Sequence, residues 1–463
     1  MSMRRAPTRL IAGLVGLAVA GVAGAYAATV LFGGIGGDPQ ARLTTAVDPQ
    51  LIQRGQYIAA AGDCAACHTA PGGKPFAGGL SIATPIGAVY TTNITPDKAT
   101  GIGNYSYGDF ERAVRRGATP EHSLYPAMPF PSYARVSDSD LQALYAYFKY
   151  GVPPVAQPDK AADIPWPLSM RWPLTYWRWL FAPGIPATRV AASDDPGRDR
   201  GAYLVESLGH CGACHTPRGL ALQEKALTDR DGADYLASGL VDDYVANDLR
   251  GDPMTGLGSW SADDIVQFLK TGRNADTAAF GGMTDVVEHS TRYMADADLQ
   301  AIAQYLKSLP ARRQDGFAYA PAAGAALAAG DVSARGALDY LNNCAACHLS
   351  SGRGYVSTFP ALAGNPVVNA ADPSSLISIV LHGGSEVATD ATPARFAMPP
   401  FGERLSDQEI ADVVTFIRSR WGNNAPSVTP EQVAKIRTAP HAPISPYPAG
   451  DPRAAEQAAA ADR

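Results

Sequence analysis

The chain contains little that suggests a thiol enzyme, a disulfide scaffold or a nucleic-acid-binding protein. Only six of its 463 residues are cysteines, and three short motifs use all of them, so no thiol is left for a disulfide or a catalytic nucleophile. Charged residues make up 18% of the chain and the net charge is −6, which provides no basic surface for nucleic acid. No acid–base pair stands out that could activate an organic substrate.

The three motifs share the pattern C-x-x-C-H, which is the attachment signature of c-type haem. Two thiols three positions apart on one helical turn can form thioethers to two vinyl groups on one edge of the porphyrin. The adjacent histidine then becomes the proximal iron ligand. A lone C-x-x-C also occurs in zinc knuckles and thioredoxin-like redox pairs. A zinc site would need a second C-x-x-C or an H-x-H pair nearby, and none lies close to any motif.

The sequence therefore predicts three covalent c-type haems. The attachment residues would be Cys64, Cys67, Cys211, Cys214, Cys344 and Cys347. The proximal ligands would be His68, His215 and His348.

Three loosely similar units surround these motifs, and the length suits about three domains of roughly 100–200 residues each. Each unit opens with Arg-Gly and a short apolar helix, at Arg54, Arg200 and Arg335. Each closes with a capped amphipathic helix, after Ser137, Asp296 and Ser406. Ser406 and Glu409 form a capping-box pattern, and further helices are predicted after Ser106 and Ser261.

These elements predict a mainly α fold with three tandem cytochrome c-like domains, because an attachment helix packed against a closing helix is the arrangement of cytochrome c. No convincing run of alternating strand residues is present. The predicted domains are residues 51–155, 199–310 and 333–422, and residues 156–198 connect the first two. Residues 423–463 form a tail with one short helix at Thr429-Pro430, and the sequence after residue 440 is predicted to be disordered.

The N-terminal segment, residues 1–37, directs the rest of the chain across a membrane. Arg4, Arg5 and Arg9 precede an uncharged stretch, which places its start in the cytoplasm. Two interpretations stay open. The apolar stretch Leu10–Phe32 is long enough for a membrane anchor, whereas Ala25-Tyr26-Ala27 is a possible signal-peptide cleavage site. Both place the haem units on the periplasmic side of the bacterial cytoplasmic membrane.

The axial position of each iron opposite the histidine determines what the haem can do. A methionine ligand there gives an electron carrier, and an empty position allows ligand binding or catalysis. Met128 and Met398 each lie in a proline-flanked loop ahead of a closing helix, and both are predicted ligands. Met283 follows Gly281-Gly282 and is preferred in the second unit. Met254 lies too early and Met294 too near the closing helix. The other histidines are interpreted as ordinary polar residues, with His210 also a candidate propionate contact: His122, His210, His289, His382 and His441.

The segment 164–181 contains four of the six tryptophans, among prolines and two arginines. It could pack the domains together, as a linker would. It could also present a docking surface for a partner or a membrane, because aromatic and arginine side chains dominate interface cores and tryptophan favours membrane interfaces. Both interpretations stay open.

Residues 51–422 resemble the three-haem cytochrome c subunits of the quinone-linked membrane dehydrogenases of acetic acid bacteria and their relatives. Those enzymes include the quinoprotein alcohol dehydrogenase and flavin-linked gluconate, sorbitol and fructose dehydrogenases, with some aldehyde dehydrogenases. The resemblance rests on long motifs such as Thr92-Asn93-Ile94-Thr95-Pro96-Asp97, Trp166-Pro167-Leu168-Ser169-Met170-Arg171-Trp172-Pro173, Thr216-Pro217-Arg218-Gly219, Gln223-Glu224-Lys225-Ala226-Leu227 and Phe359-Pro360-Ala361-Leu362-Ala363-Gly364-Asn365.

The resemblance implies an electron-transfer subunit that accepts electrons from a catalytic dehydrogenase of the quinoprotein, flavoprotein or molybdenum type. It would deliver them to ubiquinone in the cytoplasmic membrane, with His/Met ligation at all three irons. The long apolar N-terminus departs from the cleaved signal of the alcohol dehydrogenase members and points to a different partner. The alternatives are a carrier that feeds a terminal oxidase and a multihaem peroxidase.

Overall fold

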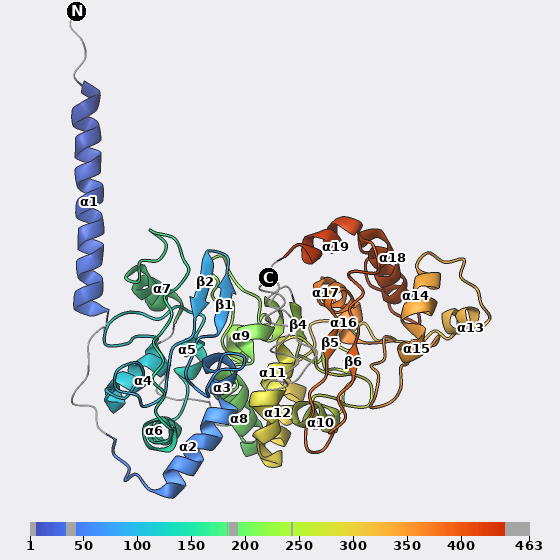
Figure 1. Cartoon of the computed structure of the whole chain (residues 1–463), viewed down its shortest axis with the longest axis horizontal. Helices are drawn as coiled ribbons and strands as arrows, with labels where there is room; N and C mark the ends of the chain where they lie inside the picture. The colour runs from blue at the N-terminus through green and yellow to red at the C-terminus, as the bar shows by residue number, and fades with distance from the viewer. Residues whose placement is uncertain (1–5, 34–42, 183, 185–192, 242–243, 440–463) are drawn as a thin grey trace, which may run out of the picture.

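The computed structural model describes residues 6–33, 43–182, 184, 193–241 and 244–439. Figure 1 shows three helical units in a row, with the N-terminal helix α1 (Ala6–Phe32) projecting from the first. Among the described residues, no helix is both long enough and apolar enough to cross a membrane. The predicted disorder of residues 440–463 and the start of the linker after α1 lie outside the described residues.

The first unit begins where Asp48 caps α2 by accepting a hydrogen bond from the Leu51 amide, with Pro49 at the first helical position. The predicted helix after Ser106 is confirmed, with a capping box between Ser106 and Asp109. The unit consists of α2 (Pro49–Ala61), α3 (Cys64–His68), β1 (Ser81–Thr84), β2 (Gly87–Tyr90), α4 (Tyr107–Arg116), α5 (Phe130–Tyr133), α6 (Asp138–Ala146) and the π-helical turn η1 (Tyr147–Gly151).

The second unit follows α7 (Pro173–Phe181). Ser261 forms the predicted cap of α10 with Asp264, but the closing helix differs from the prediction. The N-cap of this closing helix, α12, is Ala295, which has no side-chain group that could cap it. Asp296 lies in the first turn instead, where its carboxylate interacts favourably with the helix dipole. The elements are α8 (Pro196–Tyr203), η2 (Leu204–Leu208), α9 (Gly212–His215), η3 (Asp229–Asp231), β3 (Ala237–Val241), β4 (Tyr244–Asp248), α10 (Ala262–Thr271), α11 (Gly282–His289), η4 (Thr291–Tyr293) and α12 (Asp296–Ser308).

The third unit contains both predicted caps. Ser406 and Glu409 form a capping box at the closing helix, and Thr429 caps the last helix with Pro430 at its first position. The elements are α13 (Ala322–Ala328), α14 (Ala337–Asn343), α15 (Ala345–His348), α16 (Pro366–Asn369), α17 (Ser374–His382), β5 (Gly384–Ser385), β6 (Ala397–Met398), α18 (Asp407–Arg418) and α19 (Pro430–Arg437).

Within the part of the chain that the structure describes, three short antiparallel hairpins, one in each unit, were not expected from the sequence. They pair β1 with β2, β3 with β4, and β5 with β6. The strands contain two to five residues, and most of those residues are half-buried on both faces. Such strands show no alternation of polar and apolar residues, which is the signal that sequence analysis depends on.

The Arg-Gly pair that opens each unit fixes the crossing of its first and last helices. A Cβ on Gly55 would lie 2.0 Å from the Ala143 carbonyl oxygen, and one on Gly201 would lie 2.0 Å from that of Ala301. Only glycine permits this approach. The preceding arginine pairs with an aspartate of the closing helix in each unit: Arg54 with Asp140, Arg200 with Asp298, and Arg335 with Asp412.

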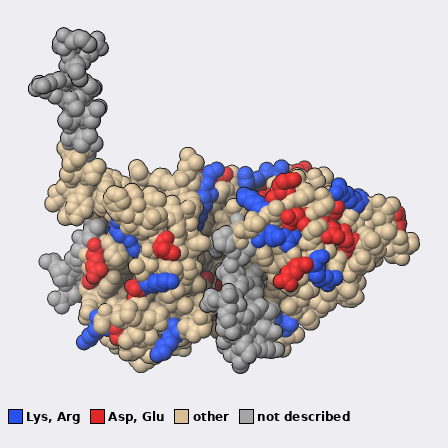
Figure 2. All heavy atoms as spheres, turned by 45° about the horizontal axis from the view of Figure 1, so that its top comes forward, with Lys and Arg blue, Asp and Glu red and all other residues tan. Residues whose placement is uncertain are grey.

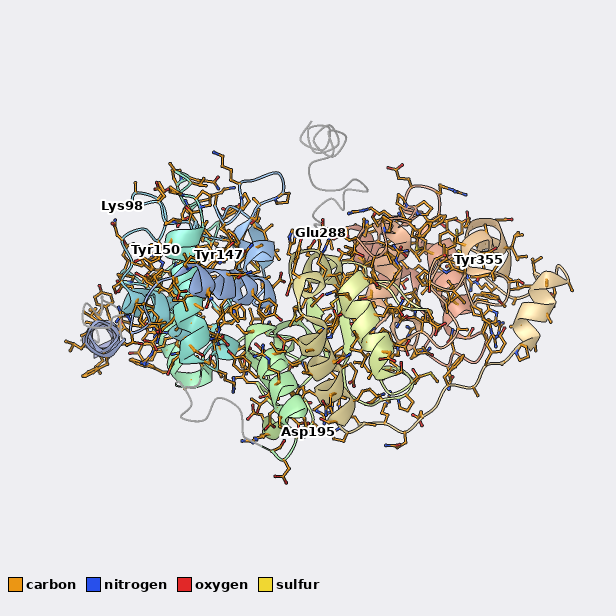
Figure 3. The ribbon with its side chains drawn as sticks, turned by 90° about the horizontal axis from the view of Figure 1, so that it is seen from below. Lys98, Tyr147, Tyr150, Asp195, Glu288 and Tyr355 are labelled. Atoms are coloured by element: carbon orange, nitrogen blue, oxygen red, sulfur yellow. The ribbon has the colours of Figure 1, made fainter. Side chains whose placement is uncertain are left out.

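The first two units share one hydrophobic core, while the third has its own. In Figure 3, Tyr147 marks the first unit, Glu288 the second and Tyr355 the third. The shared core is supported by two reciprocal hydrogen bonds. The Tyr57 hydroxyl donates to Asp298 at 2.5 Å, and the Tyr203 hydroxyl donates to Asp140 at 2.7 Å. Each tyrosine lies three residues after its own arginine, so the contact is pseudo-symmetric.

We expect Tyr203→Phe to lower the free energy of unfolding of the haem-loaded protein by ~2 kcal/mol. The change leaves Asp140 and the Ser137 amide, which donates to the same hydroxyl, without this partner. The matched control Tyr150→Phe removes a hydroxyl from a side chain that is 58% exposed and should cost less than about 0.5 kcal/mol. Urea unfolding measures both, and equal effects of the two changes would contradict the proposed role of the reciprocal contact.

Candidate haem sites

Each C-x-x-C-H motif forms one turn of helix. The His215 amide donates to the Cys211 carbonyl at 2.9 Å, and the His348 amide donates to the Cys344 carbonyl at the same distance. In the first two units the residue before the motif has a left-handed backbone, with φ of 51° at Asp63 and 36° at His210. The turn brings both cysteines and the histidine of each motif to one short segment, as haem attachment requires.

None of the six cysteines forms a disulfide, and each is partly buried. Burial raises the pKa of Cys64, Cys67, Cys211 and Cys344 to about 12, which keeps these thiols neutral near pH 7. The charges of Asp63 and Cys214 contribute to the raised pKa of Cys67, so the attachment motifs of the first two units lie close together.

The three motif histidines share one contact that decides their tautomer. The Nδ1 atom of His68 lies 2.7 Å from the Thr92 carbonyl oxygen, and that of His215 lies 2.6 Å from the Asn247 oxygen. His348 makes the same contact with Pro360 at 2.8 Å. A carbonyl oxygen can only accept, so Nδ1 carries the proton and Nε2 keeps its lone pair. Burial lowers the pKa of all three imidazoles, which favours the neutral form that a metal needs.

The three predicted methionine ligands lie in three different local structures. Met128 is half-buried against the shared core in the loop before α5, and its carbonyl accepts the Phe130 amide at 2.8 Å. Met283 lies in the first turn of α11, and Met398 lies in β6 opposite Gly384. Met294, which the sequence placed too near the closing helix, is 4% exposed within the core. Ligation by Met128, Met283 and Met398 stays a prediction.

His210 has a structural role that sequence reasoning missed. Its ring packs edge-on against Tyr133, with centroids 5.4 Å apart, and hydrogen-bonds to the backbone of Gly62. Burial lowers its pKa to about 4, so the side chain is neutral. His210 therefore connects the attachment turn of the second unit to that of the first. Its position directly before Cys211 was the only sequence signal, and it did not reveal the partner.

Comparison with known proteins agrees with this geometry. The cytochrome c family model matches residues 52–151 and 333–421. The gluconate 2-dehydrogenase cytochrome c subunit of Pantoea cypripedii is 56% identical over 394 residues, which cover 84% of this chain and 89% of the relative. The cytochrome c subunit of the quinone alcohol dehydrogenase of Komagataeibacter europaeus is 52% identical, covering 87% of each chain. The fructose dehydrogenase cytochrome subunit of Gluconobacter japonicus is 37% identical, covering 83% of this chain and 82% of the relative.

The chain belongs to the family of dehydrogenase cytochrome c subunits. Its cytochrome c domains imply covalent haem, and its role is electron transfer. The residues present fit that group, because no disulfide ties up a motif thiol and each motif histidine is held through Nδ1 with Nε2 available. When bound, haem iron supplies reversible one-electron chemistry. The chain contributes the thioether anchors, a fixed imidazole orientation and a buried environment around it.

We expect Met398→Leu to abolish the absorption band typical of Met–iron ligation at one haem and to lower the reduction potential of that haem only, because methionine ligation raises the potential. The matched control Met254→Leu changes a methionine that lies outside the three predicted ligand positions and should leave all bands intact. Spectropotentiometric titration of the purified subunit measures both. Retention of the full band in Met398→Leu would mean that another group binds this iron.

Proposed function

We propose that this cytochrome c subunit carries three covalent haems and passes electrons, one at a time, from a partner dehydrogenase to ubiquinone. The observation that carries the proposal is the repeated contact between motif histidine and backbone carbonyl. His68, His215 and His348 each occur in a C-x-x-C-H turn, and each has its Nδ1 engaged and its Nε2 free. The same histidine contact in all three motifs supports one haem at each motif.

The methionine positions support a carrier in preference to a catalyst. A multihaem peroxidase needs an iron with an open or readily opened face. Each unit instead offers a methionine after its motif: Met128, Met283 and Met398. A carrier that feeds a terminal oxidase would share these ligands, so the two carrier functions differ only in the acceptor.

The kind of partner is inferred from the relatives, whose names describe cytochrome subunits of gluconate, alcohol and fructose dehydrogenases. A catalytic dehydrogenase of the quinoprotein, flavoprotein or molybdenum type would supply the electrons. The reading frame next to the gene for this chain would encode that partner, and the two proteins would co-purify.

Association with a membrane surface or a protein partner, as the proposed function requires, is supported by exposed apolar side chains on α1 and α7. Leu31 and Phe32 are each 73% exposed at the end of α1, and Leu180 is 74% exposed on α7. The two helices are in contact, since the Tyr176 hydroxyl donates to the Ala25 carbonyl at 2.9 Å. Apolar side chains of this size favour a lipid surface or a protein partner over water.

We expect the intact mass of the purified subunit to exceed that of the processed polypeptide by three haems. Replacing both cysteines of one motif, as in Cys344→Ala with Cys347→Ala, removes two thioether anchors and should reduce the excess to two haems. Mass spectrometry under denaturing conditions counts only covalent haem. An excess of two haems in the unaltered protein would contradict the proposed count.

We expect membranes that lack this chain to lose substrate-dependent ubiquinone reduction, while the dehydrogenase still reduces a soluble dye. The dye accepts electrons directly from the catalytic subunit and therefore controls for its presence. Restoring the chain should restore ubiquinone reduction. Unimpaired ubiquinone reduction in membranes that lack the chain would rule out the proposed acceptor and favour the terminal oxidase.

A further inference from the structure

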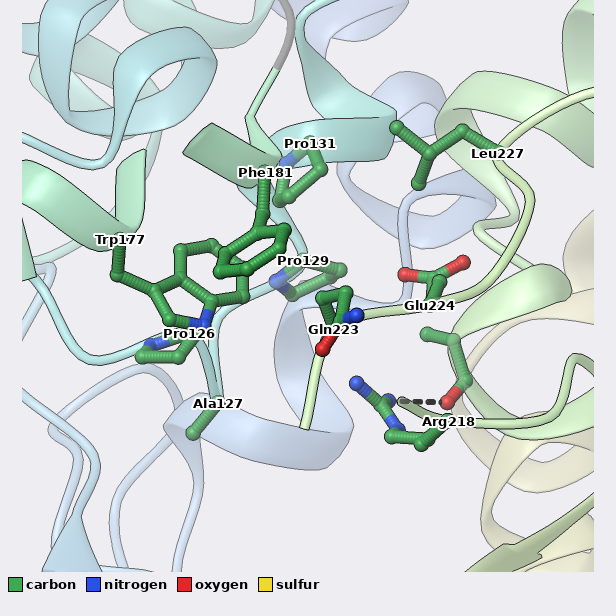
Figure 4. A pocket seen from close by; sticks show the side chains of 11 residues that line it. Pro126, Ala127, Pro129, Pro131, Trp177, Phe181, Arg218, Gln223, Glu224 and Leu227 are labelled. Carbon is green, nitrogen blue, oxygen red and sulfur yellow. Dashed lines mark hydrogen bonds between the residues drawn. The ribbon is translucent and has the colours of Figure 1, made fainter. Parts of the chain in front are cut away.

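A recess lies where the first unit, α7 and the second unit meet (Figure 4). About 350 Å³ of space between atoms lies in the recess, a volume that includes open solvent. One wall is the proline-rich loop that contains Met128, the second wall is α7, and the third is the loop 217–227 that follows the second C-x-x-C-H motif. The recess therefore adjoins a predicted iron ligand of the first unit and the haem attachment turn of the second.

Aromatic rings of α7 form the apolar side of this recess. The rings of Trp177 and Phe181 lie 5.5 Å apart, and Phe130 packs edge-on against Trp177 at 5.9 Å. The indole nitrogen of Trp177 donates to the Ala221 carbonyl at 2.8 Å, which ties α7 to the opposite wall. A rigid aromatic wall suits a flat ring, because aromatic pairs gain energy from offset and edge-on contacts.

The polar side of the recess contains a carboxyl group without a partner. Within the described part of the chain, Oε2 of Glu224 is buried and makes no hydrogen bond. Such groups are uncommon in folded proteins because they cost free energy, so each calls for an explanation. Burial raises the pKa of Glu224 to about 7, although the positive charges of Arg218 and Arg135 oppose the shift, so part of the population holds a proton near neutral pH.

The sequence of the second motif makes room for this carboxyl group. A Cβ on Gly212 would lie 2.8 Å from Oε2 of Glu224. The first and third motifs have Ala65 and Ala345 at this position, and only the second has glycine. Among the described residues Arg218 forms no ion pair with Glu224, because its guanidinium donates to the carbonyls of Ala213 and Leu222 instead.

Exposed leucines adjoin in sequence two residues that line the recess. Leu222 precedes Gln223 and is 45% exposed, and Leu180 precedes Phe181 and is 74% exposed. In Figure 2 the surface at the base of the N-terminal helix α1 is almost free of charged side chains, whereas they gather densely over the third unit. Helix α1 contacts α7, whose Trp177 and Phe181 line the recess.

We propose that this recess binds the ring of the quinone acceptor and that Glu224 donates a proton to one of its carbonyl oxygens. The proposal rests on the function proposed above. Reduction of a quinone to a quinol takes two electrons and two protons, and each carbonyl becomes a hydroxyl. The subunit supplies the electrons one at a time. Glu224 supplies one proton and regains it from water, and water at the open side supplies the other.

The test uses the complete complex of dehydrogenase and haem-loaded subunit, with decylubiquinone as the quinone probe and ferricyanide as an acceptor that needs no proton. Glu224→Gln should lower the rate of decylubiquinone reduction by about 100-fold, as expected for loss of a general acid. Its Kd for decylubiquinone, measured by equilibrium binding, should stay within about threefold of the unaltered value, because the amide preserves shape and a hydrogen-bond donor. Ferricyanide reduction should be unchanged.

Phe181→Ala should instead raise the Kd for decylubiquinone by about tenfold through loss of the aromatic wall. The matched control Glu403→Gln makes the same chemical change at an exposed glutamate of the third unit and should behave as the unaltered protein. If Phe181→Ala lowers haem content or ferricyanide reduction, Phe181→Leu replaces it in the binding measurement.

If neither Glu224→Gln nor the Phe181 variant changes quinone binding or reduction, the recess is not the quinone site. The proposal that ubiquinone is the acceptor would then still stand. A complex that reduces ferricyanide but never decylubiquinone would instead overturn the proposed acceptor, and with it this inference. A Kd that rises in Glu224→Gln without a fall in the rate at saturating quinone would overturn the proton-donor role and retain the site.

Discussion

The haem sites depend on one contact, the hydrogen bond that the Nδ1 atom of each motif histidine donates to a backbone carbonyl. The acceptors come from segments after each motif: Thr92 is the second residue after β2, Asn247 lies in β4, and Pro360 adjoins a bridge between Tyr355 and Phe359. Without them each imidazole could rotate or take the other tautomer, and Nε2 would no longer be reserved for iron. The loops and hairpins of this helical protein therefore position its metal ligands.

This dependence explains which parts of the molecule could be predicted from sequence. The C-x-x-C-H turns and the capping boxes at Ser106, Ser261 and Ser406 are local, since each needs only residues a few positions apart. The acceptor carbonyls are not local: one lies in a hairpin strand, one just after a hairpin and one beside an isolated bridge, and each is 12 to 32 residues from its histidine. Glu224 lay in a motif that marked the family, yet its missing hydrogen-bond partner required the three-dimensional structure.

The three units are alike in sequence but are joined differently. Units one and two exchange the Tyr57 and Tyr203 hydrogen bonds, share a core and bring their attachment turns together through His210. In the third unit the corresponding position is Leu338, which is 53% exposed. That unit contacts the second through other groups, including an ion pair between Arg273 and Glu386 at 2.8 Å. A rigid pair of sites with a separately packed third is a suitable arrangement for passing electrons between partners.

The central claim is that every iron of this subunit is a six-coordinate electron carrier. The electron paramagnetic resonance spectrum of the fully oxidised protein, quantified against its iron content, tests that claim most directly. Only low-spin ferric signals that together equal all of the iron are expected, because histidine and methionine would occupy both axial positions of every haem. A high-spin ferric signal equal to one third of the iron would contradict it, since one site would then have an open face suited to catalysis.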